Sequence, residues 1–134
     1  RICSLSKDYK HTLLWSHYAD SHKGCCIEVS VKDKKGIPIE VNYKTEIPKI
    51  TDKKDKIKLL STKSILWKYE DEVRFFRKAS YCNVNIHRVI FGQKISTKDF
   101  NFYKKLINAV DSQIQIRKIE KDEIIDGFNH ESNK

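Results

Sequence analysis

Methionine is absent from the 134 residues, and glycine and proline are scarce, with four and two copies. The small share of glycine and proline and the 39% hydrophobic content exclude collagen-like and disordered chains. No apolar run approaches the ~20 residues that a membrane-spanning helix needs. No signal-peptide pattern opens the chain. These absences indicate a globular cytoplasmic protein with no membrane association.

The missing methionine also bears on the N-terminus. The chain starts at Arg1, within the stretch RICSLS, whose residues predict a strand. We therefore expect that a native segment precedes Arg1 and that the chain is a fragment of a larger domain. We expect one α+β domain over residues 1–128 and a frayed tail over residues 129–134.

Acidic residues are fewer than basic residues. The chain has 18 aspartates and glutamates but 27 lysines and arginines, which gives a net charge of +9. A basic chain favours anionic partners, here a nucleotide or a nucleic acid. Arginine, which binds phosphate in a bidentate fashion, is rare among these cations. A solvated lysine-rich surface is therefore the alternative explanation of the charge.

Metal-ligand spacing is also lacking. The four cysteines contain no C-x-x-C pair, and His17 and His22 are five residues apart, which is wrong for one helical face. We expect no metal site and no resident cofactor. The cysteines are expected to be small buried residues in a reducing compartment; they are Cys3, Cys25, Cys26 and Cys82.

Hydrophobic periodicity predicts an α+β fold, with a mixed or mostly antiparallel sheet of about six strands and about three helices. Helices are predicted over residues 12–22, 56–67 and 96–111. Strands are predicted over residues 1–6, 25–31, 37–43, 70–78, 84–91, 114–119 and 123–128. Gly24 is placed to end the first helix in the left-handed conformation. The last helix carries an apolar stripe made of Phe100, Tyr103, Leu106, Ile107 and Val110.

The stretch LLWSHYADSHKG, residues 13–24, is the first candidate for a site. On a helix, Trp15, Tyr18 and His22 lie on one side, and His17 lies on another. One interpretation is structural, with Trp15 and Tyr18 in the core and the histidines at its rim. The other is that His17, Tyr18 or His22 lines a cleft and binds a ligand.

The stretch WKYEDEVRFF, residues 67–76, is the second candidate. On an extended strand Glu70, Glu72 and Arg74 point to one face. They form either a row of surface ion pairs or a catalytic carboxylate pair held by the arginine. Trp67, just before them, is placed to wall such a site.

Four strings in this chain resemble a bacterial family known as domain of unknown function 2971. They are CSLSKD, LLWSHYADSHKGCCIEVSV, the V-x-Y at residues 41–43, and the K-x-x-x-W-x-x-E-x-E-x-R at residues 63–74. The resemblance runs over roughly residues 1–95. Family members usually carry an upstream segment that is absent here. The resemblance implies no activity, but it implies that eight residues belong together: His17, Tyr18, His22, Gly24, Trp67, Glu70, Glu72 and Arg74.

The order of these groups also resembles that of ADP-ribosyltransferases. That resemblance implies NAD as the substrate, Tyr18 as a stacking ring, and Glu70 and Glu72 as the acidic pair that stabilises an oxocarbenium-like state. It requires Glu70 or Glu72 to lie across a cleft from the helix end.

Two alternatives compete with this enzyme. One is a nucleic-acid-binding module that uses the lysines of residues 49–58 together with Lys104 and Lys105. The other is a non-catalytic interaction domain in which Glu70, Glu72 and Arg74 are fully engaged in ion pairs.

Overall fold

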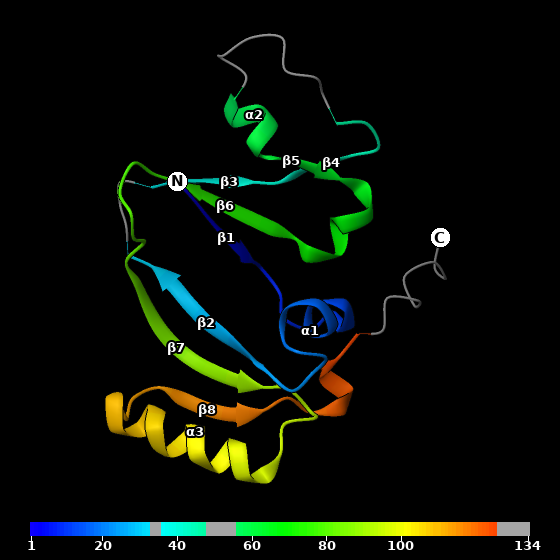
Figure 1. The fold of residues 1–134 in the computed structure, drawn as a ribbon. Coiled ribbons are helices and arrows are strands. Elements are labelled where there is room, and N and C mark those ends of the chain that lie inside the picture. The colour runs from blue at the N-terminus through cyan, green and yellow to red at the C-terminus, as the bar shows by residue number, and fades with distance from the viewer. Residues whose placement is uncertain (33–35, 48–55, 126–134) are drawn as a thin grey trace. The chain divides into compact units, whose positions relative to one another are not determined.

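The computed structural model describes residues 1–32, 36–47 and 56–125, which form two compact units (Figure 1). Unit 1 comprises Arg1–Asp8 and Asp33–Cys82, and unit 2 comprises Tyr9–Lys32 and Asn83–Lys134. The predicted tail at residues 129–134 and parts of the predicted turns, loops and last strand lie outside the described residues.

The predicted fold class is confirmed, because the described residues combine helices with mixed and antiparallel sheets. Three α-helices are formed: α1 (Thr12–Tyr18), α2 (Lys56–Leu60) and α3 (Thr97–Val110). The 3-10 helices η2 (Ile65–Glu70) and η3 (Lys121–Glu123) accompany them. The strands are β1 (Ile2–Ser6), β2 (Cys25–Val31), β3 (Ile37–Glu40), β4 (Asn42–Lys44), β5 (Thr62–Ser64), β6 (Glu72–Phe76), β7 (Val84–Phe91) and β8 (Gln115–Lys118).

Unit 1 contains an antiparallel sheet with the order β1-β6-β3 and a short parallel pair, β4 and β5. One strand was predicted over residues 37–43, but the chain changes partner at Val41. The Val41 N–H donates to the Glu72 carbonyl of β6, and the next N–H donates to the Ser61 carbonyl beside β5. This change of partner splits the predicted strand into β3 and β4.

The predicted helix over residues 56–67 ends early, at Leu60. The Ser61 hydroxyl donates to the Ile57 carbonyl at 2.8 Å, and the Thr62 hydroxyl donates to the Lys58 carbonyl at 2.7 Å. Hydroxyls that bind main-chain carbonyls in this way compete with helical hydrogen bonds. The chain therefore leaves the helix and continues as β5.

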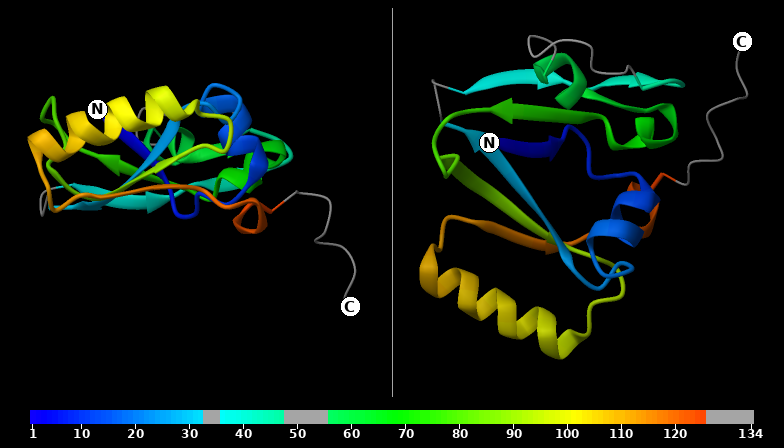
Figure 2. Two further views of the ribbon diagram at one scale, coloured as in Figure 1. Left: turned by 90° about the horizontal axis from the view of Figure 1, so that it is seen from below. Right: turned by 45° about the horizontal axis from the view of Figure 1, so that its top comes forward.

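Unit 2 combines a three-stranded sheet, β2-β7-β8, with the helices α1 and α3, which Figure 2 shows from two further sides. Successive side chains of β7 point to opposite faces of this sheet. Ile90 packs into one cluster with Trp15 of α1, while Val89 and Phe91 pack into another with Phe100 of α3. The most buried strand therefore joins both hydrophobic cores.

The predicted apolar stripe of α3 is only partly buried. Phe100 and Ile107 pack against the β7 cluster, whereas Leu106 is 51% and Val110 is 80% exposed. The stripe read from the sequence is thus wider than the surface that a three-stranded sheet covers.

Helix α1 ends at Tyr18, earlier than predicted, and Gly24 does not supply the left-handed residue. Instead Asp20, Ser21 and His22 have φ angles of 43°, 51° and 72°. Gly24 is needed for a close approach, since a Cβ there would lie 3.0 Å from the Ala19 carbonyl carbon. Its N–H donates to the Ala19 carbonyl at 2.8 Å.

Substitution of Gly92 by alanine is expected to destabilise unit 2 by more than about 2 kcal/mol. An added Cβ would lie 2.1 Å from the His22 carbonyl oxygen, so that the main chain must move. Chemical denaturation followed by circular dichroism measures this change. Gly24→Ala is the comparison, because its closest contact is 3.0 Å and its cost is expected to be smaller. Equal stabilities for Gly92→Ala and the wild type would contradict the close approach.

Candidate functional site

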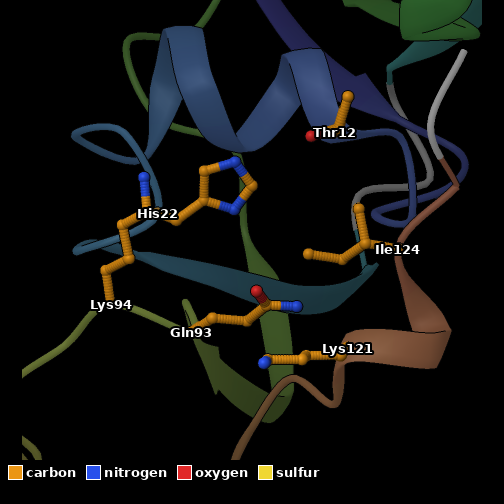
Figure 3. Close-up of a pocket in the computed structure, with 6 residues that line it drawn as sticks. All are labelled: Thr12, His22, Gln93, Lys94, Lys121 and Ile124. Carbon is orange, nitrogen blue, oxygen red and sulfur yellow. The ribbon is translucent and has the colours of Figure 1, made fainter.

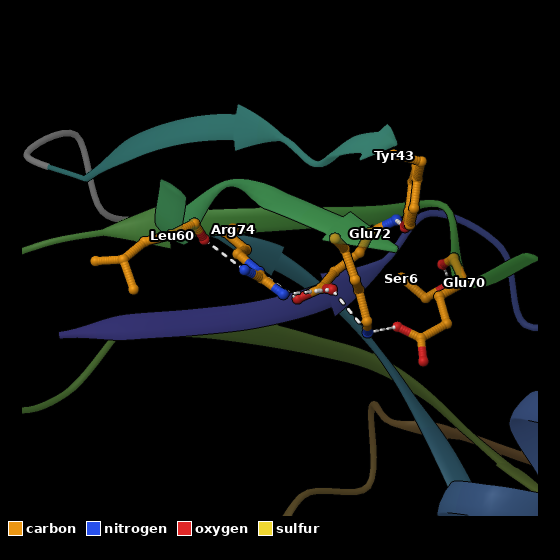
Figure 4. A network of polar contacts seen from close by, with 7 residues as sticks. Ser6, Tyr43, Leu60, Glu70, Glu72 and Arg74 are labelled. Carbon is orange, nitrogen blue, oxygen red and sulfur yellow. Dashed lines mark hydrogen bonds and ion pairs between the residues drawn. The ribbon is translucent and has the colours of Figure 1, made fainter. Parts of the chain in front are cut away.

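A buried network of charged side chains occupies unit 1 (Figure 4). Glu70 and Glu72 are only 5% and 6% exposed. The Lys63 ammonium forms salt bridges to both carboxylates, and the one to Glu72 measures 3.2 Å. Arg74 binds Glu72 in a bidentate manner, with distances of 2.7 and 3.0 Å. The structure therefore brings together the three predicted acidic and basic residues.

Glu70 and Glu72 do not lie on one strand, as was predicted, but on two different elements. Glu70 is the last residue of η2, and Glu72 is the first of β6. Between them Asp71 adopts a left-handed conformation with φ of 40°. The Ser6 hydroxyl donates to the Glu70 carbonyl at 2.6 Å, and the Glu72 N–H donates to the Tyr43 hydroxyl at 2.9 Å. These contacts hold both carboxylates against one lysine.

The electrostatics of Glu72 follow from its partners. Burial by itself raises its pKa, but hydrogen bonds from Arg74, Ser4 and Lys63 together lower the pKa to about 2. Burial by itself lowers the pKa of Lys63, but its hydrogen bonds to Glu70 and Glu72 outweigh this effect and raise the pKa. Glu72 is therefore a carboxylate at any physiological pH, with its oxygens already bound by cations.

Lys63 is the network residue that sequence analysis missed. It opens the K-x-x-x-W motif, and two neighbouring acids require a compensating cation when they are buried. Its ammonium also lies 5.1 Å from the centre of the Trp67 ring, as a cation–π pair. Trp67 is 37% exposed and packs beside Tyr69, so it lies at the side of the network that Lys63 occupies.

In unit 2 the structure separates the predicted ligand-binding residues. Trp15 is buried, and its indole N–H donates to the Tyr9 carbonyl at 2.6 Å. The His22 ring stacks on Trp15 with a centroid distance of 6.3 Å and an angle of 16°. Tyr18 is 65% exposed, so it is not the core anchor that was predicted. His17 is also exposed and packs edge-on against Tyr18.

The turn after α1 is fixed against the end of β7. The Gly92 N–H donates to the Gly24 carbonyl at 2.9 Å, and the Lys94 N–H donates to the His22 carbonyl at 3.0 Å. Three successive non-glycine residues in the left-handed region are costly, by about 1–3 kcal/mol each, and such strain clusters at ligand sites. The strained residues, 20–22, end on His22.

A pocket of about 320 Å³ opens beside this turn (Figure 3). Its lining residues are Thr12, His22, Gln93, Lys94, Lys121 and Ile124. In Figure 3 the His22 imidazole and the Gln93 carboxamide point into the same space, with the Lys121 ammonium beside the amide. None of the six lining residues is acidic, and among the described residues neither lysine forms a salt bridge.

A second ion-pair network in unit 2 includes Glu123, the sequence neighbour of the pocket residue Ile124. Arg117 donates to both oxygens of Glu123, at 2.5 and 2.7 Å, and the Tyr9 hydroxyl donates to Glu123 at 2.8 Å. Hydrogen bonding to Arg117, which outweighs desolvation, lowers the pKa of Glu123 to about 2. This carboxylate, next to Ile124 in sequence, is thus engaged by Arg117 and Tyr9.

Gln93, Lys94 and Lys121 were not predicted as site residues. They lie in a polar loop and at the start of η3, where no periodicity or motif distinguishes them from other surface residues. His22 is the predicted residue that the pocket contains. Among the other predicted cations, Lys104 and Lys105 are exposed on α3, and the lysines at residues 49–54 lie outside the described residues.

A cleft was predicted between the end of the first helix and the acidic pair. The residues predicted to line it belong to different units. Trp15, Tyr18 and His22 belong to unit 2, whereas Trp67, Glu70 and Glu72 belong to unit 1. Their opposition stays a prediction. In the described part of the chain, no cluster of three or more histidine, cysteine or acidic residues is arranged to hold a metal ion. None of the described helices has the length and apolar character needed to span a membrane.

Residues 14–75 match the model of a family described as protein of unknown function, DUF2971. The match confirms the resemblance drawn from the motifs, over a shorter range than expected. It includes the turn with His22 and the whole motif from Lys63 to Arg74, and it ends before β7. No curated protein and no solved structure matches the chain. The chain is thus similar to a family whose description names no activity.

The ionised state of Glu72 predicts a loss of stability in acid. Its pKa lies at about 2 in the folded protein, below the ordinary value of 4.5, so the folded state binds fewer protons than the unfolded state. The resulting stabilisation is present above about pH 5 and is lost as the pH falls toward 2. Between pH 7 and pH 3 we expect a loss of about 2 kcal/mol, measured by urea denaturation.

Comparison with Glu72→Gln isolates this contribution from that of Glu123, which titrates in the same direction. Glu72→Gln is expected to be less stable at pH 7, since Arg74 loses its charged partner, and to show a flatter pH dependence. The exposed residue Glu46 provides the control variant, Glu46→Gln. A pH dependence in Glu72→Gln as steep as that of the wild type would refute the assignment.

Proposed function

We propose that the chain binds a phosphate-bearing nucleotide in the pocket beside His22. The observation that carries this proposal is the composition of the lining, which combines two lysines, a histidine, a threonine and a glutamine with no acidic residue. Ammonium groups and neutral hydrogen-bond donors are the groups that proteins use to bind phosphate. The net charge of the whole chain, +9, favours the approach of an anion.

The remaining lining groups suit the nucleoside part of such a ligand. One face of the His22 ring stacks on Trp15, which fixes the plane of the imidazole. A fixed aromatic plane beside the aliphatic side chain of Ile124 is a surface on which a base can stack. The Gln93 carboxamide offers both a donor and an acceptor to the edge of a base.

The size of the pocket limits the ligand. Its volume of about 320 Å³ is at the lower end of the range for small-molecule sites, roughly 300–1,000 Å³. A mononucleotide, or one half of a dinucleotide such as NAD, is therefore the ligand proposed.

Support for an ADP-ribosyltransferase-like reaction is weaker than support for binding. A carboxylate that stabilises an oxocarbenium-like state must face the ribose. Glu70 and Glu72 are instead almost completely buried, and their oxygens are bound by Lys63 and Arg74. This arrangement favours a structural role for the acidic pair, so binding without turnover is the function proposed.

Calorimetric titration of the chain with AMP, adenosine and inorganic phosphate tests the proposal. Lys94→Ala and Lys121→Ala are each expected to weaken AMP binding about 10- to 100-fold, because each removes a charged hydrogen bond to phosphate. Adenosine is expected to bind more weakly than AMP, and higher salt is expected to weaken AMP alone.

Lys98→Ala is the matched control, because Lys98 is exposed and does not line the pocket. Equal affinity for AMP and adenosine, or unchanged affinity in both pocket variants, would overturn the proposal. Nicotinamide release from NAD is measured in parallel with Glu72→Gln and Tyr18→Ala. Release that these variants abolish, while they remain folded, would establish the enzyme in place of the binding protein.

A further inference from the structure

We propose that Cys3 and Cys82 are a redox modification site and form a reversible intramolecular disulfide. The two residues lie almost at the two ends of the sequence of unit 1, yet their thiols are within hydrogen-bonding contact. Both are half-buried, and neither is in a disulfide in the structure. The proposal does not depend on the nucleotide pocket, which lies in the other unit.

The backbone of unit 1 explains why the thiols meet. Strand β1 pairs with β6, and this places Cys3 opposite Phe75. Beyond the strand, the Arg77 N–H donates to the Arg1 carbonyl at 3.1 Å, and the terminal amino group of Arg1 donates to the Arg77 carbonyl at 2.6 Å. These bonds fix the start of the loop that carries Cys82 beside the first residues of β1.

The other two cysteines do not offer such a pair. Cys25 and Cys26 are adjacent on β2, so their side chains point to opposite faces of the sheet. Cys25 is exposed, which contradicts the prediction that all four cysteines are buried small residues. This pair is an internal control for any reaction that depends on contact between thiols.

Thiol–disulfide exchange with a small disulfide such as oxidised glutathione supplies the chemistry. The Cys82 thiolate attacks one glutathione sulfur, forms a mixed disulfide and releases one glutathione thiolate, which takes up a proton. Cys3 then loses its proton and attacks the Cys82 sulfur, which releases the second glutathione. Two electrons pass from the protein to glutathione disulfide, and two glutathione molecules leave.

Burial, and then the neighbouring Cys82, raise the pKa of the Cys3 thiol. Cys3 therefore keeps its proton until the mixed disulfide has formed beside it, which suits the second step. The closed ring would enclose all of the strands β3 to β6. A cross-link over so long a loop restricts the unfolded chain strongly.

Intact mass spectrometry after alkylation tests the proposal. The full chain is reduced, equilibrated with mixtures of reduced and oxidised glutathione, and alkylated with a maleimide. Four adducts are expected on the reduced protein, which has four cysteines, and about two on the oxidised protein. Proteolysis is expected to yield a peptide that links Cys3 to Cys82. The melting temperature is expected to rise on oxidation by on the order of 5 °C.

The double variant Cys25→Ser/Cys26→Ser is expected to oxidise as the wild type does, whereas Cys3→Ser and Cys82→Ser form no ring. The wild-type peptide map decides the matter even if a single variant fails to fold. Retention of four adducts at every glutathione ratio would overturn the proposal. So would a stable glutathione adduct on Cys82 without ring closure, or a linkage through Cys25 or between two chains.

Discussion

The close contact between Gly92 and His22 is the constraint on which the arrangement of unit 2 depends. At this point the end of β7 meets the turn after α1 so closely that no side chain fits between them. Two main-chain hydrogen bonds, from Gly92 and from Lys94, fix the turn in register with the strand. One consequence is that His22 is held in a strained conformation with its ring on Trp15. This contact therefore positions His22 and Lys94, which both line the pocket.

The two units are stabilised by different means. Unit 2 has two apolar clusters, one on each face of β7. The buried residues of the described part of unit 1 are mostly polar, and they are Val41, Ser61, Thr62, Glu70 and Glu72. Breaking one partner of a buried ion pair leaves an uncompensated charge. The polar interior of unit 1 therefore tolerates little change in Lys63 or Arg74, although neither residue need touch a ligand.

Sequence patterns predicted the parts of the fold that local chemistry determines. The bounds of β2 follow from a continuous apolar run, and the helix predicted over residues 96–111 forms as α3, which Ser96 caps. The predicted ends of α1 and α2 were wrong. Main-chain hydrogen bonds to the end of β7 hold the turn after α1, and the hydroxyls of Ser61 and Thr62 bind carbonyls at the end of α2. At the site, the pairing of Glu72 with Arg74 was predictable from alternation along a strand, whereas Glu70 joins the cluster from the end of η2. The pocket lysines were not predictable, since Lys94 and Lys121 meet only through the fold.

The way the chain divides between the units has a consequence for how it folds. Each unit is built from two separate stretches, and the chain crosses from one unit to the other after residues 8, 32 and 82. During synthesis β1 has no partner until β6 has emerged, and β2 has none until β7 follows. Contacts between distant residues form slowly and leave strand edges exposed in the meantime. A nascent chain stalled before residue 72 would therefore carry both early strands unpaired, as a target for chaperones or for aggregation.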